Sequence, residues 1–179
     1  MKPIFKKVVQ VSIVVKDLKK ALKMYYDEYG MGPWNIYNFN PSKIRDMIRN
    51  DKRVDHKFHI AQCFLGDIEM ELIEPLDEKS IYAEFLKEHG EGIHHVAYEV
   101  EDYDEAMKFF RNKGLIVTQQ GNRSFTGDLI YTYISTEQDL KHSVEICKIM
   151  PNYIKYKKDK YGNKRITFPV PDEVYPPED

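Results

Sequence analysis

The sequence predicts an α+β protein made of two tandem β-α-β-β-β modules, and two observations lead to this fold class. A strand with one apolar face runs directly into a capped amphipathic helix near the start of the chain. The same order of strand, cap and helix returns 85 residues later. A chain of 179 residues, 42% of them hydrophobic, is long enough to bury one compact core. We therefore expect one compact domain with two similar halves.

The first strand is predicted from the run VVQVSIVVKD, in which apolar residues alternate with Gln10 and Ser12. Alternation with period two is typical of a strand that is buried on one face. Asp17 then occupies the place of a helix N-cap, and apolar residues at helical spacing follow as far as Gly30. A strand and an amphipathic helix therefore open the chain without a linker.

Three more strands are expected in the first module, at 33–39, 57–65 and 68–74. The last two are joined at Gly66-Asp67, a dipeptide that suits a tight turn. The stretch between 40 and 56 is polar and basic, and we expect it to form a loop or a short helix.

An internal repeat divides the chain. Sliding residues 9–26 over 94–111 matches strand, cap and helix in one order. The matched identities are Val11 with Val96, Val15 with Val100, Asp17 with Asp102, Ala21 with Ala106 and Lys23 with Lys108. Strands expected at 115–120, 128–135 and 142–149 complete the second module. The predicted organisation is residues 1–90 for the first module with its connecting helix, 91–150 for the second module and 151–179 for a tail.

The repeat also pairs four polar residues. His95 overlies Gln10, and Glu145 overlies Glu71 in the last strand of each module. Both glutamates stand between members of an apolar stripe, so they point away from the helix side of the sheet. Two pairs of equivalent positions are what a pseudo-twofold metal site requires. The alternative for each residue alone is a polar side chain that simply faces solvent.

Two adjacent histidines in one predicted strand cannot share a role if the strand alternates regularly. His94 overlies Val9 of the apolar face, so it is expected to point toward the helix layer with a hydrogen-bonded structural role. His95 shares the polar face with Ala97 and Glu99 and is the candidate ligand.

The sequence at this point resembles the vicinal oxygen chelate superfamily of glyoxalases, bleomycin-resistance proteins and extradiol dioxygenases, over residues 8–149. The resemblance implies that the modules pair their sheets into a mixed-sheet cup, the glyoxalase/bleomycin resistance fold, around one divalent ion: zinc, nickel, cobalt or manganese. Its ligands come from the first and last strand of each module. The implied metal ligands are Gln10, Glu71, His95 and Glu145.

Two branches of the superfamily compete. The run MELIEPLDEKSIYAEFLKEHGEGIHHVAYEVED is similar to the stretch that links the modules of methylmalonyl-CoA epimerases. Those epimerases have histidine and glutamine at the first two ligand positions, whereas this chain has Gln10 and Glu71. The set of glutamine, glutamate, histidine and glutamate resembles zinc-type glyoxalase I instead, but that enzyme's arginine after the first ligand is not found here. An extradiol dioxygenase is disfavoured because its iron site needs two histidines.

The function implied is a metal-dependent isomerase or epimerase that removes a proton next to a carbonyl through a metal-stabilised enolate. Glu71 and Glu145 are the expected catalytic carboxylates, because they lie on opposite sides of the bound substrate. In the alternative, both stay on the metal and another cup residue, such as His59, moves the proton. A glyoxalase I-like lactoylglutathione lyase and a metal-independent small-molecule binding protein remain as other functions.

Substrate contacts are the least determined part of the prediction. Trp34, His59, Tyr131 and Tyr133 are the candidate substrate-binding residues, although aromatic residues on strands are more often core. The polar stretch contains several cations that suit the phosphates of a coenzyme A thioester, or that are simply solvated. These cations are Lys43, Arg45, Arg49, Lys52 and Arg53.

Composition limits the partners. A formal net charge of −2 gives no reason to expect a nucleic acid, and no apolar run reaches the length of a membrane span. We expect a cytoplasmic protein with Cys63 and Cys147 reduced, and a small-molecule substrate such as an acyl-CoA or a 2-oxo or 2-hydroxy acid derivative. The resemblance implies a homodimer. The tail is predicted to form a hairpin across Gly162-Asn163 and then an extended segment.

Overall fold

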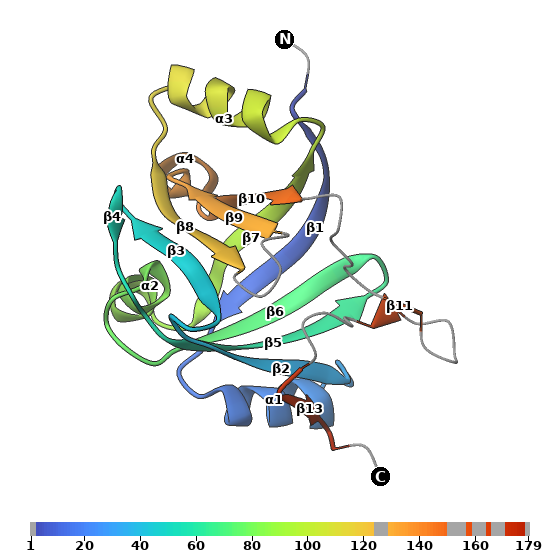
Figure 1. Cartoon of the computed structure of the whole chain (residues 1–179). Coiled ribbons are helices and arrows are strands. Elements are labelled where there is room, and N and C mark those ends of the chain that lie inside the picture. The colour runs from blue at the N-terminus through green and yellow to red at the C-terminus, as the bar shows by residue number, and fades with distance from the viewer. Residues whose placement is uncertain (1–2, 124–128, 150–156, 159–163, 166–170, 178–179) are drawn as a thin grey trace.

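The computed structural model describes residues 3–177 apart from 124–128, 150–156, 159–163 and 166–170 (Figure 1). The strands of the first half are β1 (Phe5–Val14), β2 (Trp34–Phe39), β3 (Ile44–Arg49), β4 (Lys52–Arg53), β5 (Phe58–Leu65) and β6 (Ile68–Pro75). The later strands are β7 (Gly92–Val100), β8 (Val117–Arg123), β9 (Leu129–Ile134), β10 (Ser143–Ile149), β11 (Lys157–Lys158), β12 (Lys164–Arg165) and β13 (Glu173–Tyr175). The helices are α1 (Leu18–Asp27), α2 (Ile81–His89), α3 (Tyr103–Asn112) and α4 (Glu137–Leu140).

Eleven strands form one mixed sheet in the order β13-β2-β5-β6-β1-β7-β10-β9-β8-β3-β4. The first and last strands of each module pair in parallel, β1 with β6 and β7 with β10, whereas β1 and β7 pair antiparallel and join the two modules. The sheet curves so that its two halves enclose an interior, with α1 and α3 on the outside at opposite ends (Figure 1). The predicted α+β class with two repeated units is confirmed.

Local sequence explains where both outer helices begin. The carboxylates of Asp17 and Asp102 accept hydrogen bonds from the backbone N–H of Lys20 and Glu105, each at 3.0 Å. These are the N-caps predicted from the repeat. Gly30, after α1, has a φ of +67°, which favours glycine at the end of a helix.

The prediction of a loop or short helix between 40 and 56 is wrong, because this stretch contains β3 and β4. Ile44 and Met47 are buried, and β3 pairs antiparallel with β8 of the second half. Asp46 has a φ of +53°, and the register shifts between Arg45 and Ile48, so the apolar residues do not alternate with period two. A strand of the first half therefore extends the sheet of the second half and helps to enclose the interior.

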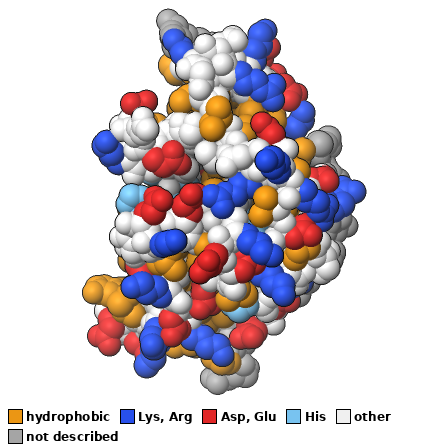
Figure 2. Space-filling model, turned by 90° about the vertical axis from the view of Figure 1, so that its left-hand side faces the viewer, with side chains coloured by type: hydrophobic (Ala, Val, Ile, Leu, Met, Phe, Trp, Pro, Cys, Tyr) orange, Lys and Arg blue, Asp and Glu red, His pale blue; other side chains and the backbone are white. Residues whose placement is uncertain are grey.

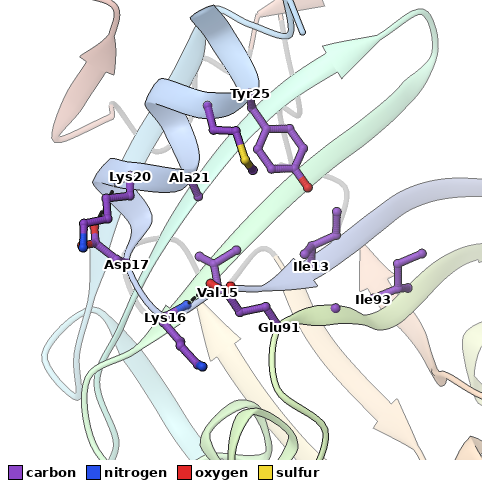
Figure 3. Close-up of a pocket in the computed structure, with 11 residues that line it drawn as sticks. Ile13, Val15, Lys16, Asp17, Lys20, Ala21, Tyr25, Glu91 and Ile93 are labelled. Atoms are coloured by element: carbon purple, nitrogen blue, oxygen red, sulfur yellow. Dashed lines mark hydrogen bonds and ion pairs between the residues drawn. The ribbon is translucent and has the colours of Figure 1, made fainter. Parts of the chain in front are cut away.

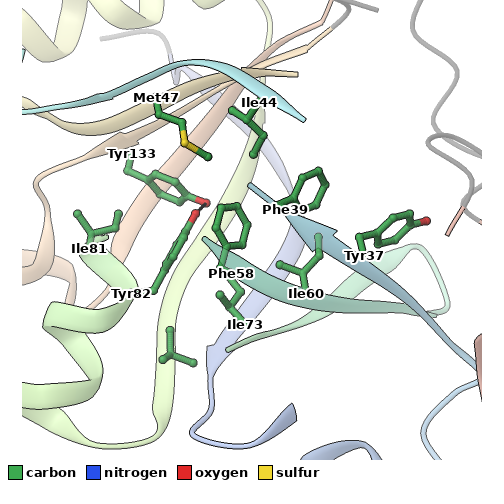
Figure 4. Packing of buried hydrophobic residues seen from close by; sticks show 11 residues of the cluster. Tyr37, Phe39, Ile44, Met47, Phe58, Ile60, Ile73, Ile81, Tyr82 and Tyr133 are labelled. Atoms are coloured by element: carbon green, nitrogen blue, oxygen red, sulfur yellow. Dashed lines mark hydrogen bonds between the residues drawn. The ribbon is translucent and has the colours of Figure 1, made fainter. Parts of the chain in front are cut away.

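The sheet has an outer face, covered by α1 and α3, and an inner face that surrounds the interior. Ala61 and Leu72 pack under α1, and Val144 and Ile146 pack under α3, all on the outer face. The inner face carries a third cluster between the two halves (Figure 4). In it the hydroxyls of Tyr82 from α2 and Tyr133 from β9 meet at 2.9 Å. The cluster consists of Val14, Tyr37, Phe39, Ile44, Met47, Phe58, Ile60, Ile73, Ile81, Tyr82 and Tyr133.

The tail returns to the first half of the sheet. β13 pairs antiparallel with β2, as the prediction of an extended segment requires. The carboxylate of Asp172 accepts a hydrogen bond from Asn38 N–H at 2.6 Å and pairs with Lys43 at 2.8 Å. Strands β11 and β12 also pair, although the predicted turn at Gly162-Asn163 lies outside the described residues.

Gly121 is required where Tyr131 crosses the inner face. The two residues are paired between β8 and β9, and a Cβ atom on Gly121 would overlap the ring of Tyr131. We expect Gly121→Ala to lower the free energy of unfolding by about 1 to 3 kcal/mol, the usual result of overpacking. Urea denaturation measures the change. Gly92→Ala is the matched control, because the nearest atom there, in Phe85, is 3.8 Å away; equal losses in both variants would contradict the prediction.

Candidate metal and proton-transfer site

The four residues that the repeat paired meet on the inner face. Gln10, Glu71, His95 and Glu145 come from β1, β6, β7 and β10, which are neighbours in the sheet. The Nε2 atom of His95 lies 2.8 Å from Glu145 Oε2, 3.4 Å from Gln10 Oε1 and 3.7 Å from Glu71 Oε2. All four side chains are buried. One imidazole nitrogen therefore faces oxygen atoms of the other three residues.

The paired histidines do not alternate across the sheet. Along β1, Ser12 faces His95 and the next residue, Ile13, faces Ile93, so His94 is an extra residue at a register shift. The Nδ1 atoms of the two histidines lie 3.0 Å apart. The expectation that His94 points toward the outer helix layer is therefore wrong, because regular alternation was assumed and the strand bulges at this position.

His94 lies among aromatic rings of the inner face. Its ring centroid is 5.3 Å from that of Tyr82, 5.2 Å from that of Phe85 and 6.0 Å from that of Tyr133. Burial lowers the pKa of His94 well below its ordinary value, and the neighbouring His95 lowers it further. Burial therefore favours the neutral form of the His94 ring, which can accept one hydrogen bond.

Three more polar residues belong to this site, and the sequence pattern did not single them out. Glu69 accepts hydrogen bonds from the amide nitrogens of Gln10 and, at 3.1 Å, of Gln62. Glu71 accepts from Gln62 Nε2 at 2.7 Å and from Ser12 Oγ at 3.0 Å. Glu69 stands two residues before Glu71, and Ser12 two residues after Gln10, so period-two counting along each strand would have found both.

The site concentrates carboxylates away from water. Burial raises the pKa of Glu71 well above its ordinary range, and the nearby carboxylates of Glu145 and Glu69 raise it further. Burial, followed by the charge of Glu145, also raises the pKa of Tyr133. The pKa of Tyr131 is raised by the same two causes in the same order. A cation in the middle of this group would remove the repulsion between the carboxylates.

The donor set suits a divalent ion. Glu145 Oε2 is buried and has no hydrogen-bond partner among the described residues, and its near contact is His95 Nε2 at 2.8 Å. An imidazole, an amide oxygen and carboxylates match the ligand preferences of zinc and of similar ions. Within the described ranges, no three His, Cys, Asp or Glu side chains are already gathered closely enough to hold a metal. Glu71 would have to turn from Ser12, Gln62 and the amide nitrogen of Gln10 to join the other donors.

The structure separates the four predicted substrate-binding residues. Tyr131 and Tyr133 lie on the inner face: Tyr133 is paired with Glu145 across β9 and β10, its ring centroid is 4.8 Å from that of His95, and the ring centroid of Tyr131 is 5.8 Å from that of Tyr133. Trp34 is fully buried in the outer cluster under α1, and its Nε1 donates to the backbone oxygen of Met31 at 2.6 Å. Trp34 therefore does not face the interior, contrary to its expected role as a substrate contact.

His59 is also outside the cup. On β5 the inner residues are Phe58, Ile60 and Gln62, so the residue between the first two faces outward. His59 Nδ1 lies 3.1 Å from Glu74, and the side chain is 35% exposed. The sequence did not show which face of β5 carries His59, because the face depends on the register of β5 against β6.

Most of the predicted phosphate-binding cations already have partners. Lys43 pairs with Asp172, Arg49 with Glu84 and Arg53 with Asp55, while Arg45 and Lys52 are exposed. Figure 2 shows one face on which basic and acidic side chains are intermingled, so neither sign dominates it. Among the described residues, this side therefore carries no broad basic patch.

A separate pocket of about 540 Å³ lies on the outer face, beside α1 (Figure 3). Its floor includes Ile13 and Ile93, and Tyr25 and Lys20 of α1 line its side. The backbone N–H of Lys16 donates to the carboxylate of Glu91 at its edge. No member of the quartet lines this pocket, so it is distinct from the inner site.

The family profile described as Glyoxalase/Bleomycin resistance protein/Dioxygenase superfamily matches residues 9–133. The chain belongs to this superfamily. Its fold resembles methylmalonyl-CoA epimerase from Mycobacterium tuberculosis, with a TM-score of 0.56 and 21% identity, covering 84% of this chain and 93% of that chain. It also resembles a variant of Streptomyces coelicolor methylmalonyl-CoA epimerase in complex with 2-nitronate-propionyl-CoA, with a TM-score of 0.55 and 20% identity over 80% of this chain and 94% of that chain.

A curated protein is similar in sequence. The uncharacterized protein YqjC of Bacillus subtilis (strain 168) is 26% identical over 138 residues, which span 77% of this chain and 89% of the relative. The description of the superfamily names enzymes as well as a resistance protein. None of the helices in the described part of the chain combines the length and apolarity needed to cross a bilayer.

Proposed function

We propose that this chain is a divalent-metal-dependent isomerase that removes and returns a proton on the carbon next to a carbonyl. The observation that carries the proposal is the approach of Glu71 and Glu145, one from each module, to the same nitrogen of His95. Gln10, Glu71, His95 and Glu145 would hold one zinc, nickel, cobalt or manganese ion. When bound, such an ion supplies Lewis-acid stabilisation to the negative charge that develops on the substrate carbonyl oxygen.

The protein's own side chains supply the proton transfer. Glu71 or Glu145 would leave the ion to act as the base, and burial raises the pKa of Glu71 well above its ordinary range in the metal-free protein. Glu145 stands opposite it across His95, and the two carboxylates suit an epimerase, in which the proton leaves one face and returns to the other. The hydroxyl of Tyr131 is buried without a hydrogen-bond partner among the described residues, and it would donate to a substrate oxygen.

An acyl-CoA thioester is the first substrate class to test. The epimerase structures of similar fold include one in complex with 2-nitronate-propionyl-CoA, which supports a coenzyme A derivative. Arg45 and Lys52 are exposed on the β3–β4 hairpin and are the cations of that region best placed to contact a phosphate. The tyrosines of the inner face would contact the acyl end.

A lactoylglutathione lyase is the second candidate, and one observation favours it. Two glutamates together with Gln10 and His95 line the site, and this set resembles that of zinc-type glyoxalase I. Both reactions begin by removing a proton next to a carbonyl, so the same residues would serve. A metal-independent binding protein is the remaining alternative. We also expect a homodimer, as the superfamily resemblance implies, and a cytoplasmic location, as the sequence itself indicates.

Solvent exchange separates these functions. The metal-loaded protein is expected to transfer deuterium from solvent into methylmalonyl-CoA, and mass spectrometry of the recovered thioester measures it. Exchange only into the product formed from the glutathione hemithioacetal of methylglyoxal would assign the lyase instead. Absence of stoichiometric metal after dialysis, with no exchange into either compound, would overturn the proposed function.

A further inference from the structure

We propose that His94 and Glu69 are positioning residues that set the direction of the two neutral ligands of the site. The inference rests on the proposed function, because it concerns the quartet as a metal site. His95 and Gln10 each have one end that binds a metal and another end that donates a hydrogen bond. Each must be held with the correct end toward the ion, and each has a buried acceptor on its other side.

The first pair is His94 and His95. Nε2 of His95 faces the oxygens of Gln10, Glu71 and Glu145, so this is the nitrogen that would bind the ion. Its proton must then stay on Nδ1, where it needs an acceptor. Nδ1 of His94 lies 3.0 Å from that atom.

The packing around His94 supports a role for its imidazole nitrogen. The side chain is 5% exposed, and the bulge in β7 brings it to the inner face beside His95. Rings of Tyr82 and Phe85 from α2 hold it edge to face. A residue that only filled this space would be apolar, because burying an imidazole in an aromatic box is unfavourable unless its nitrogen makes a hydrogen bond.

The second pair is Glu69 and Gln10. The amide nitrogen of Gln10 donates to Glu69 Oε1 and, at 3.3 Å, to Glu71 Oε1, while its oxygen faces His95 Nε2 at 3.4 Å. A carboxylate only accepts hydrogen bonds, so it attracts the nitrogen end of an amide and repels the oxygen end. Gln62 donates to the same Glu69 oxygen at 3.1 Å and holds that carboxylate in place.

Zinc affinity tests the first pair with two variants of nearly equal size. Asparagine can place an acceptor oxygen near the position of the histidine Nδ1, whereas leucine has no acceptor. We expect His94→Leu to weaken zinc binding by about 10- to 100-fold, the usual loss for a residue that orients a ligand, and His94→Asn to restore most of it. Competition with a chromophoric chelator measures the affinity, and circular dichroism checks that both variants fold.

The tautomer of His95 gives a readout that a purely structural role would not change. In the zinc-loaded wild type and in His94→Asn, the ¹⁵N shifts of His95 are expected to show a protonated, hydrogen-bonded Nδ1. In His94→Leu that proton should exchange rapidly with water. An unchanged spectrum and unchanged affinity in His94→Leu would overturn the role of His94.

The second pair needs a parallel measurement. Glu69→Gln keeps the size of the side chain but adds a donor that can attract the oxygen of Gln10, so zinc affinity should fall by about 10-fold. Glu74→Gln is the control, because Glu74 lies on the same strand but its carboxylate is 3.1 Å from His59, on the outer face. Equal affinity in Glu69→Gln and wild type would overturn the role of Glu69. Failure of the wild type itself to bind zinc would reject the proposed function and this inference together.

Discussion

His95→Ala is expected to abolish the binding of a divalent ion and, with it, deuterium exchange into substrate. His95 is the residue that the other three members of the quartet approach, at 2.8 to 3.7 Å from its Nε2. Losing a residue that merely orients a ligand weakens metal binding by about 10- to 100-fold, so losing the ligand should exceed about 100-fold. Metal content after dialysis and calorimetric titration with zinc measure the loss.

The control for this change removes a histidine elsewhere. His89 lies on α2 with a side chain that is 62% exposed, so His89→Ala should leave metal content and exchange unchanged. Retention of stoichiometric metal by His95→Ala would contradict the site. Loss of metal from both variants would indicate that another group of histidines binds the ion.

The parts of the site that could be predicted are those that depend only on strand period. Glu71 stands between Met70 and Leu72, whose apolar side chains contact the α1 cluster, so its own side chain must point the other way. The internal repeat then related Glu71 to Glu145 and Gln10 to His95. The sequence could bring these four residues together because residues that are equivalent in two paired modules meet near the axis that relates the modules.

The parts that could not be predicted depend on departures from regular strands. The extra residue in β7 turns His94 inward, and a bulge is not visible in the run IHHVAYEV. Asp46, in the left-handed region, interrupts β3 in the same way. For Trp34 and His59, membership of a strand was predicted correctly, but the face was not, because neighbouring residues on both faces of β2 and β5 are apolar.

Glu71→Gln is expected to have opposite effects on stability and on catalysis. Burial and two nearby carboxylates raise the pKa of Glu71, so the folded protein binds this proton more tightly than the unfolded chain does. The contribution of Glu71 to stability is therefore fully present below its ordinary pKa of 4.5 and is lost as the pH rises toward the folded-state pKa. Glutamine carries no charge at any pH and does not incur this loss.

We expect metal-free Glu71→Gln to be more stable than the metal-free wild type by about 1 to 3 kcal/mol near neutral pH, on the scale of desolvating one buried polar group. The difference should shrink at lower pH, as urea denaturation at about pH 5 and about pH 8 would show. Deuterium exchange into substrate should fall by about 100-fold or more, because a catalytic base is lost.

Glu74→Gln again serves as the control, since that carboxylate lies on β6 outside the site and should change neither quantity. A Glu71→Gln variant that is less stable than the wild type at both pH values would show that hydrogen bonds from Ser12 and Gln62 outweigh the repulsion. Full deuterium-exchange activity in the same variant would indicate that Glu145, and not Glu71, is the catalytic base. Neighbouring buried charges do not by themselves stabilise a fold. A variant that gains stability and loses activity is therefore the result expected if these carboxylates serve metal binding and proton transfer.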